Sequence, residues 1–291
     1  MILVISSQSY LGKSFIEYKN NKNIISTFHK KKSNSNSKYF KLGKSNIKNL
    51  INSEIKCCLF YITIKNKNKK INNNYDFQNF KKYTKTVINY LIQKKIHFIY
   101  FSTESVYENQ KKNKHSENKK LRPIQRYARH KFQIENYIKK KAQIYTILRL
   151  GRVYSVKNIN VNILSQIVTQ IQNSKKKEIM FANDYKFSPL FEGDLNKVVE
   201  ICINKKITGT YNLCENQEVS YYSIAKNIIK LKNLNKNLKI KKGSIQEFSK
   251  ITKKGSISMN NLKLKKKIKF KFSSLKKNIL LYLNKINNLP R

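Results

Sequence analysis

The chain has 291 residues, 40% of them hydrophobic, which is enough to bury one or two cores and argues against a disordered protein. Its formal net charge of +47 comes mainly from lysines that are spread along the whole chain. Proteins that recognise specific nucleic-acid sequences rely more on arginine. We therefore expect weak, salt-sensitive attraction to nucleic acid and no specific binding. No apolar run approaches the roughly 18 residues that a membrane-spanning helix needs. The four cysteines lack the spacing of a metal site or of a disulfide framework, so we expect no bound metal and a reducing, cytoplasmic environment.

Apolar runs of strand length alternate with segments of helical period. The clearest helix is predicted over 77–95, where apolar residues recur at spacings of three and four. This alternation predicts an α/β fold with a doubly wound, Rossmann-like parallel sheet, whose strands are covered on both faces and are therefore apolar nearly throughout. The predicted strands are 2–5, 24–28, 57–64, 97–102, 144–150 and 210–214.

The last third of the chain has a different character. It contains the helical stretch VSYYSIAKNIIKL, a lysine-rich stretch and a final helix near 274–286, with few signals for buried strands. We therefore expect a second, smaller, mixed and partly helical lobe. The predicted first lobe covers 1–155 plus 191–213, and the predicted second lobe covers 156–190 plus 214–291.

The turn after the first strand reads SSQSYLG, from Ser6 to Gly12. Dinucleotide-binding folds place a glycine-rich phosphate loop here, because the turn needs positive φ or close approach of the phosphate to the backbone. Of three glycine positions spaced three apart, only Gly12 keeps its glycine, while Ser6 and Ser9 stand at the others. A turn without a ligand is the alternative. The candidate cofactor-binding residues of this turn are Ser6, Ser9, Tyr10, Leu11 and Gly12.

The second predicted strand continues into STFHKKK and lacks the acidic residue that accepts hydrogen bonds from the adenosine ribose of NAD. The basic residues from His29 to Lys32 suit the additional phosphate of NADP. A cofactor at this turn would therefore be NADP or NAD, with a slight preference for NADP.

Tyr127 and Lys131 are four residues apart, which places both side chains on one face of a helix. The spacing alone carries little weight in this lysine-rich chain, because six other tyrosines share it. The context is more informative, since the strand HFIYFST ends in the hydroxyl pair Ser102 and Thr103, 24 residues before Tyr127. Thr103 could orient a carbonyl, Tyr127 could transfer the proton, and Lys131 could lower the pKa of the phenol.

Five stretches now carry a resemblance over almost the whole chain: FSTESVYE, RPIQRYARHKFQIE, ILRLGRVYS, NDYKFSPLFEGDLNKVV and GTYNLCENQEVSYYSIAKNI. Their order and spacing resemble the extended short-chain dehydrogenases/reductases, in the sugar-nucleotide epimerase and reductase group, and most closely the dTDP-4-dehydrorhamnose reductase type. The resemblance implies Thr103, Tyr127 and Lys131 as the catalytic residues, with Tyr127 and Lys131 also contacting the cofactor. It implies Thr103, Glu104 and Arg152 on the substrate side.

By this resemblance the first lobe binds NAD(P) and the second binds a nucleotide-linked sugar. The implied reaction is reduction of a 4-keto group for cell-surface polysaccharide precursors. Related dehydratases carry Asp then Glu after the threonine, whereas Glu104 and Ser105 follow Thr103 here, so dehydration is not expected. A sugar-nucleotide epimerase and a non-catalytic, nucleotide-binding regulatory module with a degenerate glycine turn are the alternatives, and a homodimer is possible.

Other polar and sulfur-bearing residues are expected to be structural. We expect Cys57 and Cys58 in the core and His97 as a structural residue of its strand. His130 is expected to face solvent or the helix flank. Asp194 is expected to cap or charge the start of a helix.

Overall fold

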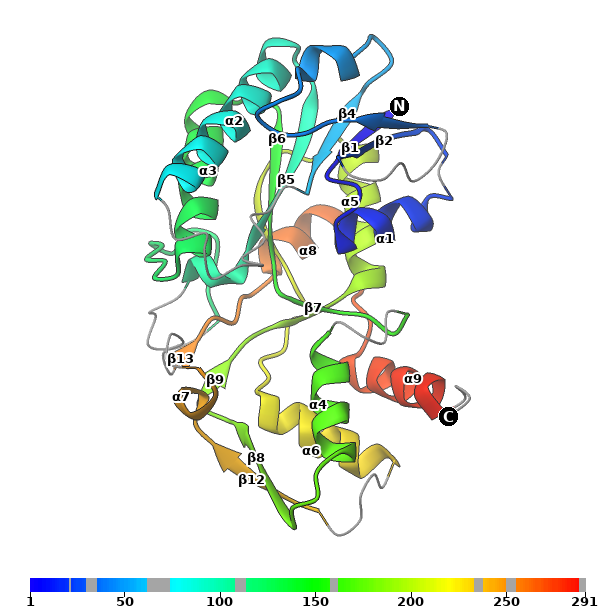
Figure 1. The fold of residues 1–291 in the computed structure, drawn as a ribbon, viewed down its shortest axis with the longest axis vertical. Coiled ribbons are helices and arrows are strands. Elements are labelled where there is room, and N and C mark those ends of the chain that lie inside the picture. The colour runs from blue at the N-terminus through cyan, green and yellow to red at the C-terminus, as the bar shows by residue number, and fades with distance from the viewer. Residues whose placement is uncertain are drawn as a thin grey trace. The chain divides into compact units, whose positions relative to one another are not determined.

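The computed structural model describes residues 1–20, 22–29, 36–61, 74–107, 114–157, 162–232, 238–249 and 255–287. The doubly wound α/β fold expected from the sequence is present as a seven-stranded parallel sheet of order β11-β6-β5-β4-β1-β2-β3 (Figure 1). Its strands are β1 (Ile2–Ile5), β2 (Ile24–Phe28), β3 (Ser37–Tyr39), β4 (Cys57–Phe60), β5 (His97–Thr103), β6 (Tyr145–Leu150) and β11 (Gly209–Leu213).

The central strands form because their residues are apolar without interruption. All four residues of β4, Cys57 to Phe60, are buried, as are Leu3 to Ile5 of β1. β1 pairs in parallel with β4 on one side and with β2 on the other. The predicted strand 57–64 is confirmed over Cys57–Phe60, and its residues 62–64 lie outside the described part of the chain.

Helices cover both faces of the sheet (Figure 1). α2 (Asn74–Gln93) and α3 (Arg126–Lys141) pack together on one face. α1 (Tyr10–Tyr18) and α5 (Glu192–Asn204) lie on the other, where Asn196 Nδ2 donates to Ser14 Oγ at 2.8 Å. The 3-10 helix η1 (Ile47–Leu50) packs beside α2. The core of the first face joins residues such as Ile88, Phe98 and Ile134.

The chain forms two compact units. The first contains Met1–Thr103, Arg126–Arg149 and Asn196–Tyr211, and the second contains Glu104–Gln125, Leu150–Leu195 and Asn212–Arg291. These bounds differ from the predicted lobes mainly in residues 104–125, which pack with the second unit. The ligand that each lobe binds stays a prediction.

The second unit packs α4 (Ile163–Gln172), α6 (Tyr221–Lys232) and α9 (Leu275–Asn287) around one apolar core. The predicted final helix is confirmed by α9. The remaining helices are η2 (Glu104–Tyr107), α7 (Ile245–Phe248) and α8 (Leu262–Ile268). The described residues of this unit also form three parallel two-stranded pairs, β7 (Arg152–Tyr154) with β10 (Pro189–Phe191), β8 (Glu178–Ala182) with β12 (Lys239–Gly243), and β9 (Tyr185–Lys186) with β13 (Gly255–Ser256).

Cys57 and Cys58 are in the core as expected, and all four cysteines are buried free thiols. The structural role of His97 is confirmed, since its Nε2 lies 2.8 Å from Thr146 Oγ1 and 3.1 Å from the Ile207 carbonyl.

Within the described residues, no helix combines the length and the apolar character needed to cross a membrane.

The expectation for His130 is wrong, because its ring is buried and lies edge-on to Phe77 and Phe80. Burial lowers the pKa of His130 to about 4, so it is neutral near pH 7. Asp194 lies in the first turn of α5 as expected. Its carboxylate also accepts hydrogen bonds from the backbone and side chain of Ser273, just before α9, and so ties two helix starts together.

Candidate active site

The turn between β1 and α1 keeps the backbone conformation that glycine usually provides. Ser6 has a φ of 61°, in the left-handed region that non-glycine residues rarely adopt. Its N–H donates to Thr27 Oγ1 at 3.0 Å, and the Ser7 hydroxyl donates to the Thr27 carbonyl. These bonds to β2 hold the turn in place, so the left-handed conformation at Ser6 persists without a glycine.

Ser9 and Gly12 form the start of α1. Ser9 is the N-cap, and its hydroxyl accepts a hydrogen bond from Gly12 N at 3.2 Å. A Cβ at Gly12 would lie 2.8 Å from the Ser6 carbonyl oxygen and 2.9 Å from Ser7 Cα, so no side chain fits there without moving the backbone. Ser6 and Gly12 thus keep the backbone shape that glycines give a phosphate-binding turn, while the Ser9 hydroxyl accepts from one of the N–H groups at the start of the helix.

The residues that would distinguish NADP from NAD follow β2. His29 is exposed, and its backbone N–H lies 3.5 Å from Gln8 Oε1. The lysines at 30–32 lie outside the described residues. The preference for NADP stays a prediction.

The structure places Lys131 against the strand that ends in Thr103. Thr103 is the last residue of β5, Tyr127 lies in the first turn of α3, and α3 packs on β5. Lys131 Nζ donates to the carbonyl of Phe101, on β5, at 2.8 Å. The same ammonium lies 5.8 Å from the centre of the Tyr127 ring and 4.8 Å from that of Tyr100. The Lys131 ammonium therefore lies near the Tyr127 ring and is bonded to β5 two residues before the end of that strand.

Burial controls the charge of Lys131. The residue is only 3% exposed, and desolvation lowers the pKa of its ammonium to about 7, while the Glu135 carboxylate acts in the opposite direction. Because a lysine in water titrates near 10.4, this pKa is strongly perturbed, as is common for groups that take part in chemistry. Lys131 can change its charge near neutral pH.

Tyr137 offers a comparison on the same helix, because Lys141 also follows it at a spacing of four. Its hydroxyl donates to Asn89 Oδ1 at 2.5 Å, on α2, and Lys141 is exposed. The spacing of tyrosine and lysine is therefore equal at Tyr127 and Tyr137, but only the Tyr127 pair is joined to the end of β5.

Glu104 and Arg152 form an ion pair in the second unit. Glu104 is 3% exposed, and its Oε1 accepts from Arg152 Nε at 3.2 Å. Arg152 Nη1 also donates to the hydroxyl of Tyr221 at 3.0 Å, and its guanidinium lies 5.1 Å from the centre of the Phe187 ring. Burial raises the pKa of Glu104 to about 7, although Arg152 acts to lower it.

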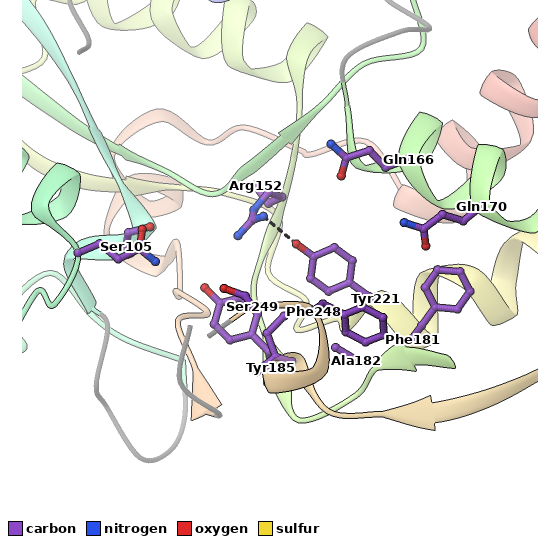
Figure 2. A pocket seen from close by; sticks show the side chains of 12 residues that line it. Ser105, Arg152, Gln166, Gln170, Phe181, Ala182, Tyr185, Tyr221, Phe248 and Ser249 are labelled. Atoms are coloured by element: carbon purple, nitrogen blue, oxygen red, sulfur yellow. Dashed lines mark hydrogen bonds between the residues drawn. The ribbon is translucent and has the colours of Figure 1, made fainter. Parts of the chain in front are cut away.

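Arg152 lines a cavity of about 390 Å³ within the second unit. Figure 2 shows Gln166 and Gln170, one turn apart on α4, facing the same space as Arg152 and Tyr221. The rest of the lining combines hydroxyl groups, a further amide and apolar or aromatic groups. These residues are Ser105, Gln125, Phe181, Ala182, Tyr185, Ile245, Phe248 and Ser249. Among the described residues, this lining carries one cation and no carboxylate.

The sequence had identified only Arg152 among the cavity residues. Gln166 and Gln170 carry a local signal, since their spacing of four places both on the polar face of an amphipathic helix. Tyr185 and Phe248 have none, because one lies on a two-residue strand and the other ends a four-residue helix. Within the described residues, no group of three His, Cys, Asp or Glu side chains is placed to hold a metal ion.

A family model described as "RmlD substrate binding domain" matches residues 71–288, three quarters of the chain. The chain belongs to this family. The resemblance to extended short-chain reductases and epimerases of nucleotide-linked sugars is thereby confirmed. None of the curated proteins compared with the chain matches it.

Solved structures show the same fold as this RmlD-family chain. A dTDP-4-dehydrorhamnose reductase from Clostridium acetobutylicum is 17% identical, with a TM-score of 0.73 and coverage of 98% of this chain and 99% of that one. The Bacillus anthracis reductase of the same name, solved in complex with NADP, is 18% identical with a TM-score of 0.77 and 98% coverage of both chains. A UDP-N-acetylglucosamine 4-epimerase from Bacillus cereus is 19% identical, with a TM-score of 0.76 and coverage of 100% and 97%.

Proposed function

We propose that this RmlD-family protein is an NAD(P)H-dependent reductase of the 4-keto group of a nucleotide-linked sugar. One observation carries the proposal. The Lys131 ammonium lies 5.8 Å from the centre of the Tyr127 ring and is held by the carbonyl of Phe101, two residues before Thr103. A proton donor, a cation that lowers its pKa and a hydroxyl at a strand end are the groups that reduction of a carbonyl needs beside a hydride source.

Each side chain has a distinct task in this proposal. The phenol of Tyr127 gives its proton to the carbonyl oxygen as that oxygen becomes a hydroxyl. Thr103 donates a hydrogen bond to the same oxygen and orients it. The charged form of Lys131 lowers the pKa of the phenol, so that the proton can leave near neutral pH. A nicotinamide cofactor, when bound, would supply the hydride, held by Lys131 and by the turn Ser6, Ser9, Tyr10, Leu11 and Gly12.

The cavity in the second unit suits a nucleotide-linked sugar. Arg152 is a fixed cation for a phosphate, and Tyr221 and Phe248 offer ring faces for a base. Gln166 and Gln170 can exchange hydrogen bonds with polar edges of a base or sugar. The described lining residues include no carboxylate that would repel a diphosphate.

The test is to measure NADPH and NADH oxidation by the purified protein with dTDP-4-dehydrorhamnose or another nucleotide-linked 4-keto sugar. We expect oxidation that requires the sugar nucleotide and is lost in Tyr127→Phe. Interconversion of a UDP-sugar without net oxidation of the cofactor would instead identify an epimerase of the same family. Failure of a set of such substrates to react, despite cofactor binding, would contradict the proposal.

A non-catalytic, nucleotide-binding module is the second candidate. It is favoured by the turn, where Ser6 and Ser9 replace glycines and the Ser9 hydroxyl already accepts from Gly12 N. Nicotinamide fluorescence on titration with NADPH separates the two, because a module of this kind would bind nucleotide and show no turnover. The buried free thiols are compatible with the cytoplasm, which is the proposed compartment.

A further inference from the structure

Glu135 is a fully buried acid on α3, one helical turn after Lys131, and it is 0% exposed. Its carboxylate accepts a hydrogen bond from the Ser102 hydroxyl, on β5, at 2.5 Å. It also pairs with Arg149 of β6, whose Nη2 lies at 2.7 Å and Nε at 3.1 Å. A carboxylate removed from water in this way needs such partners, and it is tied to both strands beneath the helix.

The charge of Lys131 depends on burial and on the groups around it. Burial favours the neutral amine, and its Nζ atom bonds the Phe101 carbonyl and lies over the rings of Tyr100 and Tyr127. Glu135 lies on the same helix face and attracts the ammonium electrostatically, which raises the pKa that burial lowers. The positive charge of Lys131 is therefore supported by a carboxylate that is itself fixed by Ser102 and Arg149.

We propose that Glu135 is a positioning residue, whose carboxylate, fixed by Ser102 on the strand that ends in Thr103, keeps the Lys131 side chain charged one helical turn away, beside Tyr127. This inference rests on the proposed function. Tyr127, Lys131 and Glu135 follow one another at spacings of four on α3, so proton donor, cation and counter-charge lie along one stripe of the helix.

Other titratable groups also face this stripe. From β5, the phenol of Tyr100 has its pKa raised by burial and by the charges of Tyr127 and Glu135, so it stays neutral. From α3, His130 is neutral near pH 7, and Lys139 Nζ lies 3.5 Å from Glu135 Oε2 but is 35% exposed. From β6, Arg149 forms an ion pair with the Glu135 carboxylate and so adds a second positive charge near it. The carboxylate whose charge acts on Lys131 in this group is that of Glu135.

The experiment measures the pKa of Lys131 directly, by NMR of protein carrying isotope-labelled lysine. The Lys131 signal is identified by its absence in Lys131→Met. We expect Glu135→Gln to lower this pKa by about one to two units, because a nearby charge is lost in a buried site. Arg149→Gln should raise it, because a second positive charge is lost, and Glu135→Asp should keep it closer to the wild type than Glu135→Gln does.

Glu200→Gln is the matched control. Glu200 is an acid of α5 that bonds Tyr18 and Lys19, and the same chemical change there should leave the Lys131 signal in place. If Glu135 only neutralised Arg149 for stability, none of these variants would move the Lys131 pKa, and the inference would be overturned. If Glu135→Gln does not fold, the pKa of Lys131 in Arg149→Gln is the deciding measurement, and we expect that pKa to rise.

The pH profile of kcat/KM supplies the second measurement. Lys131 loses its charge as pH rises, so the alkaline fall of kcat/KM should begin about one to two units lower in Glu135→Gln than in wild type. An unchanged profile would count against the inference. A shift of the Lys131 signal in a protein that reduces no nucleotide-linked sugar would keep the link between Glu135 and Lys131 and refute the proposed function.

Discussion

Two strand-to-helix connections of the sheet differ in whether they keep the backbone conformation or the side chains expected from the family. After β1, the turn has lost two of its three expected glycines, yet Ser6 still has a φ of 61°. After β5, Thr103 ends the strand and Lys131 of the following helix bonds back to it through Phe101. The first connection preserves a backbone shape, and the second preserves specific side chains.

The difference follows from what each connection provides. A backbone conformation can survive loss of glycine when neighbours hold it, at a cost of about 1–2 kcal/mol for the left-handed region. Thr27 supplies such support by accepting from Ser7 and bonding Ser6. A proton donor beside a cation has no such substitute, because its chemistry depends on particular atoms. Variants at the two connections should therefore fail in different ways.

The largest effects are expected at Tyr127 and Lys131. Tyr127→Phe removes one hydroxyl and little volume, so folding should persist while reduction falls by about 10²–10⁴-fold. Cofactor binding should change little. The measurement is kcat/KM for NADPH oxidation with a nucleotide-linked 4-keto sugar, together with the fluorescence of bound NADPH.

Lys131→Met should reduce activity further, because the phenol loses its electrostatic support and the cofactor loses a hydrogen-bond donor. Tyr137→Phe is the control, since that hydroxyl bonds Asn89 on the neighbouring helix and not the end of β5. Equal losses at Tyr127 and Tyr137, or no loss at either, would show that the pair has no chemical role.

At the turn, the largest effect on stability is expected from Gly12→Ala. The added Cβ would meet the backbone of Ser6 and Ser7 below 3 Å, so we expect a loss of about 1–3 kcal/mol in the free energy of unfolding. Ser9→Ala removes the N-cap hydroxyl and should cost about 1 kcal/mol. Urea titrations would measure both, and a Gly12→Ala protein as stable as wild type would mean that this turn is not tightly packed.

Beyond the end of β5, Glu104 makes stability depend on pH. Its pKa is about 7 in the folded chain, above the usual value of 4.5, so between these values the folded state holds a proton that the unfolded state releases. The contribution of Glu104 to stability therefore falls as pH rises through this window, by about 1–3 kcal/mol. Glu104→Gln should remove this fall.

Denaturant midpoints at pH 5 and pH 8 would compare the two proteins. Glu200→Gln serves as control, because hydrogen bonds lower the pKa of that carboxylate and give its contribution the opposite pH dependence. If wild type and Glu104→Gln lose the same stability between these pH values, Glu104 is not the group responsible.

The smallest effect is expected from restoring the glycines. Ser6→Gly with Ser9→Gly should tighten NADPH binding by less than about tenfold, since the turn already has the required shape and only side-chain obstruction is removed. Nicotinamide fluorescence gives the dissociation constants. An unchanged constant would place these positions away from the cofactor phosphates.

The sequence was a good guide to the sheet and a poor one to the second unit. Strands such as β1 and β4 are uninterrupted apolar runs, and that signal does not depend on their neighbours. β12 reads KIKKG and is largely exposed, and β9 and β13 have two residues each, so their pairing comes only from contacts distant in sequence. No local pattern distinguishes such strands from loops.

The sequence by itself determined the order of the central strands and helices, and it determined the family of the chain. It also identified Thr103, Tyr127 and Lys131 as a hydroxyl, a phenol and an ammonium. These inferences were possible because hydrophobic periodicity, motifs and residue spacing are local properties of the chain. The sequence context had already singled out Tyr127, and the tertiary structure added that Lys131 is bonded to the strand through the Phe101 carbonyl. The tertiary structure also decided that Lys131 is buried, with its pKa lowered to about 7, and that Glu135 is held by Ser102 and Arg149. Burial and charge arise from residues brought together by folding, and no stretch of the chain contains them alone.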